Sequence, residues 1–117
     1  MYDALLETDF GSHVSCGPSG CRLVDLISDG VVDEVWVWAD PTIGSWESIM
    51  VGPDAWAVNG PSSVTHPDLT RPAVIMGWTW QMGVDNALGS FGHRTEAAIK
   101  RYVPASEWQH FMRLSEL

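Results

Sequence analysis

Two runs of apolar, β-branched and aromatic residues predict the main strands of a sheet. The first run, Val31–Ala39, stops at Asp40 and Pro41, because proline cannot donate a hydrogen bond to a β-ladder. The second run, Ala73–Trp80, is almost entirely apolar, which is typical of a strand buried on both faces. Between these two runs, Asp54–Val58 predicts a shorter strand.

Helical spacing of apolar residues precedes and follows these strands. Leucine and isoleucine side chains in Cys21–Ser28 recur at helical intervals, and Gly30 stands where a helix-ending glycine belongs. Tyr2–Phe10 predicts a short helix or an ordered arm. The longest pattern is a stripe at alternating steps of four and three residues: Val84, Leu88, Phe91, Thr95, Ala98 and Tyr102. It predicts a long helix that is continuous or broken near Gly92, and that ends before Pro104.

The order of these elements predicts the fold class. A helix, a glycine and a strand in succession form half of a β-α-β unit, in which the strands run parallel. A chain of 117 residues has room for one domain with one core. We therefore predict a single α/β domain over residues 1–117, whose small sheet of roughly three to five strands is at least partly parallel and packed with helices.

The charge balance limits the partners of this domain. Six lysine and arginine residues stand against fifteen aspartate and glutamate residues, for a net charge of −9. Nucleic acids and anionic membranes bind proteins through cationic groups, so we expect neither as a partner. No apolar run is long enough to cross a bilayer, and the first residues lack the pattern of a secretory signal. Neutral or cationic partners remain.

The two cysteines lie in one short segment rich in glycine and proline. Cys16 and Cys21 are five positions apart, a spacing that permits a small disulfide loop without requiring one. His13 precedes them, but a metal site built on these three residues needs a fourth ligand from elsewhere. We therefore favour free or disulfide-bonded cysteines over a metal site.

Polar residues and tryptophans follow both long strands. Ligands of an open parallel sheet bind beyond the carboxyl ends of its strands, and Trp46 and Glu47 follow the first of these ends. The helix expected after the second strand carries four further candidates: Asp85, His93, Arg94 and Glu96. An indole ring stacks on the apolar face of a sugar, and carboxylates accept hydrogen bonds from sugar hydroxyls. The sequence therefore predicts a site for a carbohydrate or another neutral small molecule at this edge.

Glycoside hydrolysis requires two carboxyl groups, one as acid and one as nucleophile or base. We predict that Glu47 and Glu96 are this pair, and that His93 completes the catalytic group. Residues predicted to bind the substrate are Trp46, Arg94, Asp40 and Asp85. The function predicted first is thus a carbohydrate-active, glycosidase-like hydrolase that needs no cofactor.

Several other interpretations stay open. The pairs Trp36 and Trp38, and Trp78 and Trp80, are expected in the core more than on a binding surface, whereas Trp46 is expected to be exposed. A non-catalytic module that binds carbohydrate or protein is the main alternative function. A metal-dependent hydrolase built on His93 and Glu96 is a less favoured one, since a helical His–Glu pair is more often structural.

Short stretches between Asp33 and Ile99 form a further pattern. They are Asp33-Glu34-Val35-Trp36, Trp46-Glu47-Ser48, Gly52-Pro53, Val74-Ile75-Met76-Gly77, Gly83-Val84 and Phe91-Gly92-His93-Arg94-Thr95-Glu96. In these stretches the chain resembles an uncharacterised domain family of larger, secreted bacterial and fungal proteins. The resemblance implies no particular activity, but it adds Asn59 to the substrate-binding residues and implies an extracellular location. Because family members are longer, it also implies a minimal or truncated domain, which a second copy or a partner subunit would complete.

Overall fold

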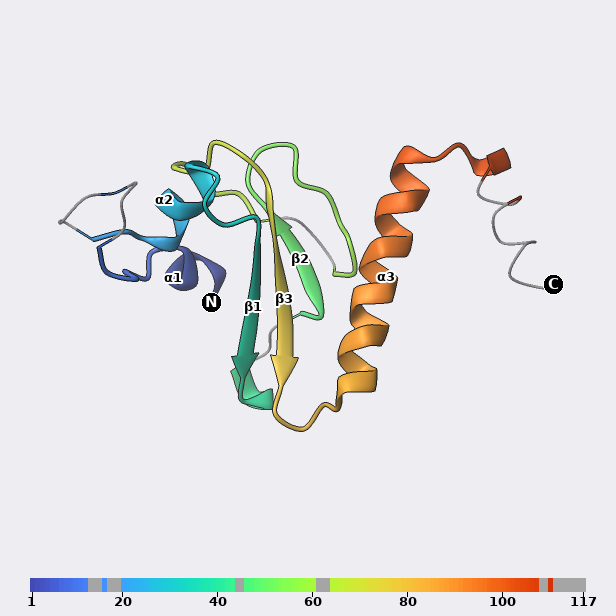
Figure 1. Ribbon diagram of the computed structural model, residues 1–117, viewed down its shortest axis with the longest axis horizontal. Helices are drawn as coiled ribbons and strands as arrows, with labels where there is room; N and C mark the ends of the chain where they lie inside the picture. Colours follow the sequence, from blue (N-terminus) through green and yellow to red (C-terminus); the bar gives the residue numbers. More distant parts are fainter. Residues whose placement is uncertain (13–15, 17–19, 44–45, 61–63, 108–109, 111–117) are drawn as a thin grey trace.

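The protein forms a small mixed sheet, which confirms the predicted small α/β fold with a partly parallel sheet. The computed structural model describes residues 1–12, 16, 20–43, 46–60, 64–107 and 110. The strands are β1 (Glu34–Ala39), β2 (Ser48–Val51) and β3 (Ala73–Thr79), in the order β1-β3-β2. β1 pairs parallel to β3, with Trp38 opposite Trp78, and β2 pairs antiparallel to β3 (Figure 1).

Helices lie on both sides of this sheet. The short helices α1 (Tyr2–Leu6) and α2 (Leu23–Ser28) lie on one side, and the long helix α3 (Val84–Tyr102) lies on the other (Figure 1). A 3₁₀ turn, η1 (Pro41–Ile43), follows β1. None of the described helices is long and apolar enough to span a membrane.

Local interactions set the ends of the helices. The backbone N–H of Gly83 donates to Oδ1 of Asn86 at 3.3 Å, which satisfies one free donor in the first turn of α3. The helix then runs through Gly92 without a break and ends before Pro104, as one of the two predicted forms has it. α2 ends at Ser28, and the predicted Gly30 follows its C-cap residue with a φ of +75°, the left-handed conformation that glycine adopts most readily.

The hydrophobic core lies between the sheet and the two short helices. Ile75 of β3 is at its centre, with 1% of its surface exposed. Its buried neighbours come from α1, α2, β2, β3 and the 65–70 loop: Leu6, Leu23, Val24, Ile27, Ile49, Val51, Leu69 and Ala73. Val35 and Val37 of β1 pack against this cluster. This core holds the sheet that carries the candidate site.

The predicted strand Asp54–Val58 is wrong, because the third strand is β2 (Ser48–Val51) instead. The segment after β2 turns sharply: Gly52 has φ of +98° and Asp54 has φ of +58°. A Cβ atom on Gly52 would lie 2.5 Å from the carbonyl oxygen of Arg71, so this turn requires glycine. The turn directs the chain away from the sheet just where a strand is predicted.

The apolar stripe predicted for the long helix does not face the sheet. Val84, Leu88 and Tyr102 of α3 are exposed, while the buried residues of this helix are Ala87 and Ser90. The buried positions of α3 thus carry small side chains, one of them polar, and not the large apolar residues of the stripe. The hydrophobic spacing thus predicted the helix correctly but not the face it buries.

The core placement expected for the strand tryptophans is wrong for three of them. Trp36, Trp38 and Trp80 are 46%, 63% and 59% exposed, and only Trp78 is half-buried. Trp78 contacts Trp36 and Trp38 in tilted geometry, with ring centroids 5.7 Å and 5.0 Å apart. The sheet face opposite the main core therefore carries an indole cluster that is largely open to solvent.

Candidate functional site

A single open cleft brings together three of the predicted site residues. It has a volume of ≈ 230 Å³ and lies between α3 and the residue that precedes β2. The residues that line it are Glu47, Met82, Asp85, Asn86, Gly89, Ser90 and His93. Glu47, Asp85 and His93 among these carry the acid–base groups that the sequence predicts for the site.

Glu47 is held from both its backbone and its side chain. Its carbonyl oxygen accepts a hydrogen bond from the backbone N–H of Gly77 at 3.2 Å, which places it beside β3. Its Oε2 accepts a hydrogen bond from Nδ2 of Asn59 at 2.7 Å. Asn59 is itself fixed by a β-bridge to Ser48. Asn59 therefore orients the Glu47 carboxylate, a more specific role than the general binding role predicted for it.

One face of α3 forms the other wall of the cleft. Asp85, Gly89 and His93 follow one another at intervals of four residues, which places them on one side of the helix. Nothing lies within 4 Å of the position that a Cβ atom on Gly89 would take. The missing side chain at Gly89 therefore leaves open space between the carboxylate of Asp85 and the imidazole of His93.

Glu96, predicted as the second catalytic carboxylate, does not line the cleft. Its Oε2 lies 3.6 Å from Nδ1 of His93, so it contacts the imidazole from one turn further along α3. Both side chains are more than half exposed at this point. Glu96 thus lies beside His93 outside the cleft, and Asp85 is the second carboxylate that lines the cleft together with Glu47.

Arg94, predicted to bind substrate, points elsewhere. Its guanidinium forms an ion pair with Glu34 of β1 and lies over the ring of Phe91, 4.6 Å from the ring centroid. Only 17% of the Arg94 side chain is exposed. Arg94 therefore joins α3 to the sheet, and the cleft does not include it.

Asp40, also predicted to bind substrate, closes the turn after β1. Its Oδ1 accepts hydrogen bonds from the hydroxyl and the backbone N–H of Thr42, at 2.7 Å and 2.9 Å. These two bonds, and a weaker one from the indole N–H of Trp80, lower the pKa of the Asp40 carboxyl below its ordinary value. Asp40 thus serves the local turn and lies outside the cleft lining.

Trp46 is exposed, in agreement with the prediction from its polar surroundings. It precedes Glu47 directly, and 49% of its surface is open to solvent. Its backbone N–H donates to the hydroxyl of Tyr2 in α1 at 3.0 Å. An exposed indole thus directly precedes, in sequence, the residue whose carboxylate lines the cleft, although Trp46 itself is not part of the lining.

The sequence did not indicate three cleft residues, namely Met82, Asn86 and Ser90. Asn86 and Ser90 lie one and five positions after Asp85, and helical spacing from Asp85 and His93 could have identified them. No spacing pattern identifies Met82. Its carbonyl oxygen accepts a hydrogen bond from the indole N–H of Trp78 at 3.2 Å. This bond connects the rim of the cleft to the indole cluster of the sheet.

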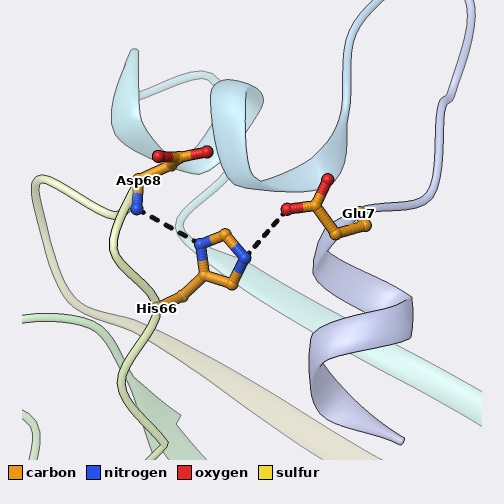
Figure 2. A group of neighbouring side chains, drawn as sticks. All are labelled: Glu7, His66 and Asp68. Carbon is orange, nitrogen blue, oxygen red and sulfur yellow. Dashed lines mark hydrogen bonds and ion pairs between the residues drawn. The ribbon is translucent and has the colours of Figure 1, made fainter.

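A second group of titratable residues lies near α1, away from the cleft. Figure 2 shows His66 between Glu7 and Asp68, with Nε2 2.9 Å from Oε1 of Glu7. Nδ1 of His66 accepts the backbone N–H of Asp68 at 3.3 Å, so Nε2 is the nitrogen that donates to Glu7. One possible ligand atom from each of Glu7, His66 and Asp68 lies within 4.8 Å of the other two. Among the described residues, this is the one group of three or more such side chains that could hold a metal ion.

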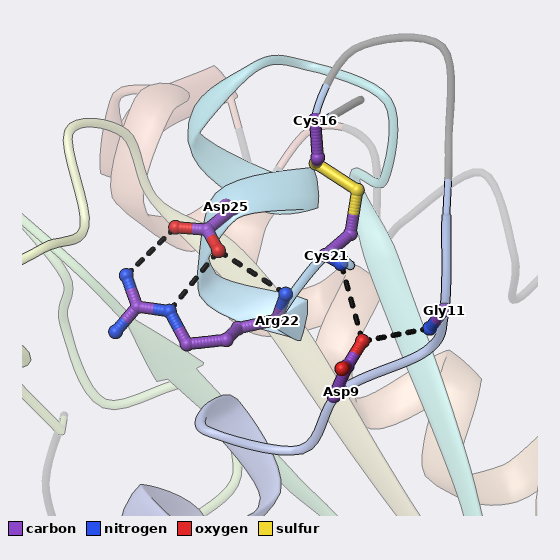
Figure 3. The surroundings of a disulfide bond; sticks show 6 residues. All are labelled: Asp9, Gly11, Cys16, Cys21, Arg22 and Asp25. Atoms are coloured by element: carbon purple, nitrogen blue, oxygen red, sulfur yellow. Dashed lines mark hydrogen bonds and ion pairs between the residues drawn. A yellow bond between two sulfur atoms is a disulfide. The ribbon is translucent and has the colours of Figure 1, made fainter. Parts of the chain in front are cut away.

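Cys16 and Cys21 form a disulfide bond, and Cys21 directly precedes Arg22 at the start of α2 (Figure 3). The bond is one of the two favoured cysteine states, and it makes the thiolates unavailable as metal ligands. His13 lies outside the described residues. Close by, Oδ1 of Asp9 accepts the backbone N–H groups of Cys21 and Gly11 at 3.2 Å and 2.8 Å, which fastens both ends of the segment (Figure 3).

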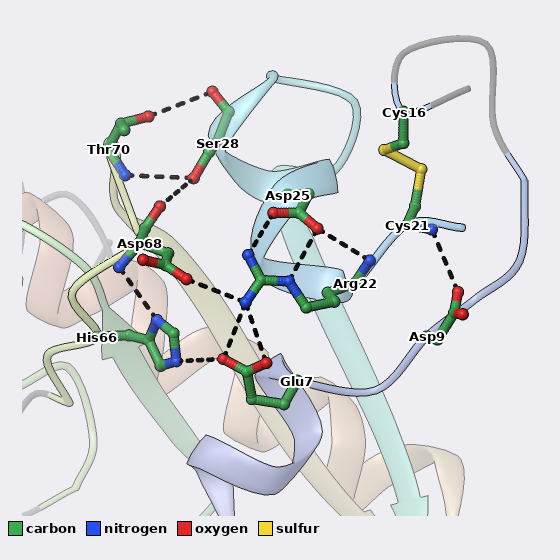
Figure 4. A network of polar contacts seen from close by, with 10 residues as sticks. All are labelled: Glu7, Asp9, Cys16, Cys21, Arg22, Asp25, Ser28, His66, Asp68 and Thr70. Carbon is green, nitrogen blue, oxygen red and sulfur yellow. Dashed lines mark hydrogen bonds and ion pairs between the residues drawn. A yellow bond between two sulfur atoms is a disulfide. The ribbon is translucent and has the colours of Figure 1, made fainter. Parts of the chain in front are cut away.

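Arg22 supplies the positive charge for the acidic group near α1. Its guanidinium bonds to Asp25 at 2.8 Å and to both Glu7 and Asp68 at 3.0 Å (Figure 4). These hydrogen bonds, led by the one to Asp25, raise the pKa of Arg22. Because a cation already lies among the carboxylates, and both nitrogens of His66 are engaged, we assign this group a structural role that joins α1, α2 and the 65–70 loop.

The Arg22 network predicts a loss of stability in acid. The hydrogen bond from Arg22 lowers the pKa of Asp25, so the folded state favours the charged carboxylate. Stability from this group is therefore present above the unfolded value of about 3.9, and it is lost as the pH falls through the lower folded value. Asp25→Asn should therefore show a smaller fall in melting temperature than wild type between about pH 5 and pH 2.

Circular dichroism melts at each pH check this expectation. Asp29→Asn, an exposed position just after α2, is the matched control and should follow wild type. If the melting temperature of Asp25→Asn fell as steeply with decreasing pH as that of wild type, the result would contradict a role for this carboxylate.

Scans against protein-family models, curated proteins and solved structures find no match to this chain. The resemblance to a family of larger secreted proteins, and the location it implies, therefore stay predictions. What can be said of function comes from the cleft and its residues.

Proposed function

We propose that the protein is a carbohydrate-active hydrolase of glycosidase type, with Glu47 and Asp85 as its pair of carboxylates. The observation that supports this most directly is that both residues line one open cleft from opposite walls. Glycoside hydrolysis needs two carboxyl groups on either side of the scissile bond. A polar cleft of ≈ 230 Å³ suits one sugar ring and its neighbouring glycosidic oxygen better than an apolar ligand.

The surroundings of each carboxylate suggest its role. Glu47 accepts a hydrogen bond from Asn59, which orients its carboxylate, as a nucleophile or base requires. Asp85 lies in the first turn of α3, across the cleft from Glu47, so the role at the leaving oxygen would fall to it as the second carboxyl group of the pair. His93, between Asp85 and Glu96 on the same helix, would take part in moving that proton to and from solvent.

The indoles near the cleft suit a sugar substrate. Trp46 is exposed next to Glu47, and Trp78 is bonded to Met82 at the rim. The apolar face of a pyranose can stack on such rings while its hydroxyls bond to the carboxylates. The net charge of −9 favours a neutral or cationic glycan over an acidic one.

A panel of chromogenic glycosides tests this proposal. Wild type should release the chromophore from at least one glycoside, and Asp85→Asn should lose most of this activity. Glu96→Gln distinguishes the two possible pairs, because it should retain activity if Glu96 only orients His93. Absence of turnover on every glycoside, or turnover that is the same in wild type and Asp85→Asn, would count against the proposal.

Carbohydrate binding without hydrolysis is the second candidate, and the exposure of Trp46 and Trp80 favours it. It predicts that soluble glycans change the tryptophan fluorescence although no glycoside is cleaved. Trp46→Ala should then lower the affinity, while Trp56→Ala, a half-buried indole beside Tyr102, serves as the matched control. Equal affinity in Trp46→Ala and wild type would exclude Trp46 as the platform.

A metal-dependent reaction at His93 and Glu96 has less support. Within the described ranges, these two residues have no third histidine, cysteine or carboxylate close enough to form a three-ligand group. Catalytic zinc sites use three protein ligands, so the pair by itself does not fit such a metal.

A further inference from the structure

The wall that α3 forms in the cleft carries a hydroxyl group without a hydrogen-bond partner. Ser90 lines the cleft, and only 8% of its surface is exposed. A hydroxyl within a helix often bonds to the carbonyl oxygen four residues earlier, as that of Thr95 does with Phe91 at 2.9 Å. The hydroxyl of Ser90 makes no such bond and has no partner among the described residues. Because an unbonded polar group is costly once it is nearly buried, this position favours a ligand that bonds to it.

The amide of Asn86 lies one turn before Ser90 and also lines the cleft. The backbone N–H of Gly83 donates to Oδ1 of Asn86 at 3.3 Å, and an N–H can be met only by the oxygen of the amide. Nδ2 of Asn86 is therefore left as a donor, and no described residue accepts a hydrogen bond from it. Residues four apart are neighbours on a helix surface, so Asn86 and Ser90 form one pair of hydrogen-bonding groups.

The carboxylates of the cleft offer the opposite chemistry. Ionised Glu47 and Asp85 can only accept hydrogen bonds, and Oε2 of Glu47 already accepts one from Asn59. None of the described residues that line the cleft is a lysine or an arginine, because the guanidinium of Arg94 pairs with Glu34. A ligand of this cleft must therefore supply donors to the carboxylates and an acceptor to Asn86.

Three kinds of polar ligand group can be compared at this arrangement. A carboxylate on the ligand would be repelled by Glu47 and Asp85, with no lysine or arginine to balance its charge. An ammonium group has no lone pair, so it cannot accept a hydrogen bond from Asn86. A hydroxyl group both donates and accepts, and it therefore meets both requirements. Neighbouring hydroxyls on one ring fit the pair formed by Asn86 and Ser90.

We propose that Asn86 and Ser90 are a binding subsite for two adjacent hydroxyl groups of a neutral sugar. The inference rests on the proposed function, since it names the substrate class of the same cleft as an uncharged sugar with a free vicinal diol. One hydroxyl accepts from Nδ2 of Asn86, and its neighbour bonds to Oγ of Ser90. Gly89 directly precedes Ser90, and the open space at its missing Cβ gives the ring room beside α3.

Binding of methyl glycosides to the whole chain tests this inference without reference to turnover. The probes are the methyl glycosides of glucose, galactose, mannose and xylose in both anomeric forms, and saturation-transfer NMR detects weak binding. At least one of them should bind, and the uronic acid form of the best probe should bind about tenfold more weakly because of its carboxylate.

Ser90→Ala removes the hydroxyl and leaves a good helix former. It should weaken binding of the best probe by about three- to tenfold, the usual contribution of one hydrogen bond between neutral groups. Ser106→Ala, the same change at an exposed serine outside the cleft lining, is the matched control and should bind as wild type does. Circular dichroism melts confirm that both variants are folded.

Monodeoxy forms of the best probe identify the bond itself. Loss of the sugar hydroxyl that meets Ser90 should weaken binding by wild type, and Ser90→Ala should then bind that deoxy sugar as well as wild type does. The adjacent position should respond to Asn86→Asp, which keeps an oxygen toward Gly83 but replaces the donor by an acceptor. This variant should shift preference toward the amino-deoxy form of the sugar at that position.

Several results would overturn the inference. They are binding of no neutral probe, equal binding by Ser90→Ala and wild type, a deoxy series in which Ser90→Ala has the same effect at every position, and an unchanged preference in Asn86→Asp. Turnover that depends on Glu47, with binding indifferent to Ser90, would keep the hydrolase and remove the subsite. Binding that depends on Ser90 without turnover of any glycoside would keep the subsite and remove the hydrolase.

Discussion

Glu47→Gln is expected to lower kcat/KM for glycoside hydrolysis by about 10²- to 10⁴-fold, the usual contribution of a positioned acid–base group. Glutamine matches the shape of glutamate, and its carbonyl oxygen can still accept the hydrogen bond from Nδ2 of Asn59. The amide can neither attack a sugar carbon nor accept a proton. The variant therefore removes the chemistry and keeps the local structure, and initial rates on the best glycoside of the panel measure the loss.

Two variants make this result interpretable. Glu107→Gln removes an exposed carboxylate that does not line the cleft, and its rate should equal that of wild type. Asn59→Ala removes the group that orients Glu47, and it should lower kcat more than it changes KM. A Glu47→Gln variant with wild-type turnover would remove Glu47 from the mechanism, and a comparable loss in Glu96→Gln would restore the pair predicted from sequence.

Ile75→Ala is expected to lower the free energy of unfolding by about 2–5 kcal/mol, the usual range for a large-to-alanine change in a core. Ile75 lies in the central strand and is 1% exposed among residues from α1, α2 and β2. A domain of this size has a stability of about 5–15 kcal/mol, so the loss is a large part of the total. Urea unfolding followed by circular dichroism measures it.

Val74→Ala is the matched control for Ile75→Ala. Val74 is the preceding residue of the same strand, so its side chain points to the opposite face, and it is half-buried. We expect a smaller loss, about 1 kcal/mol. Equal losses at both positions would mean that the two faces of β3 are equally important to stability, contrary to the observed packing.

The strands and the long helix were predictable because each has a strong local pattern. β1 and β3 fall within Val31–Ala39 and Ala73–Trp80, and α3 ends just before Pro104. β2 was missed because its four residues are too few to show periodicity. The glycine turn that follows β2 leads into Asp54–Val58, the segment wrongly predicted as a strand. The elements that could be predicted are therefore those whose apolar pattern extends over many residues.

The face of α3 and the site needed information that spacing does not contain. Hydrophobic periodicity assumes that the most apolar stripe is buried, but in the folded protein the buried residues of α3 are Ala87 and Ser90. Once the helix is rotated in this way, Asp85 and His93 face the cleft and Glu96 does not. Glu47 could be predicted from its place beside Trp46 in the connection after the first strand, whereas the second carboxylate of the cleft depended on tertiary packing.

The burial of Ala87 and Ser90 also has a consequence for how the cleft could change. Ala87 and Ser90 are 7% and 8% exposed, and Ser90 itself lines the cleft. A larger residue at either buried position would displace the helix. The distance between the carboxylates of Glu47 and Asp85 across the cleft would change with it. A domain of this kind could come to bind ligands of a different size through a single substitution at Ala87 or Ser90, with both carboxylates left unaltered.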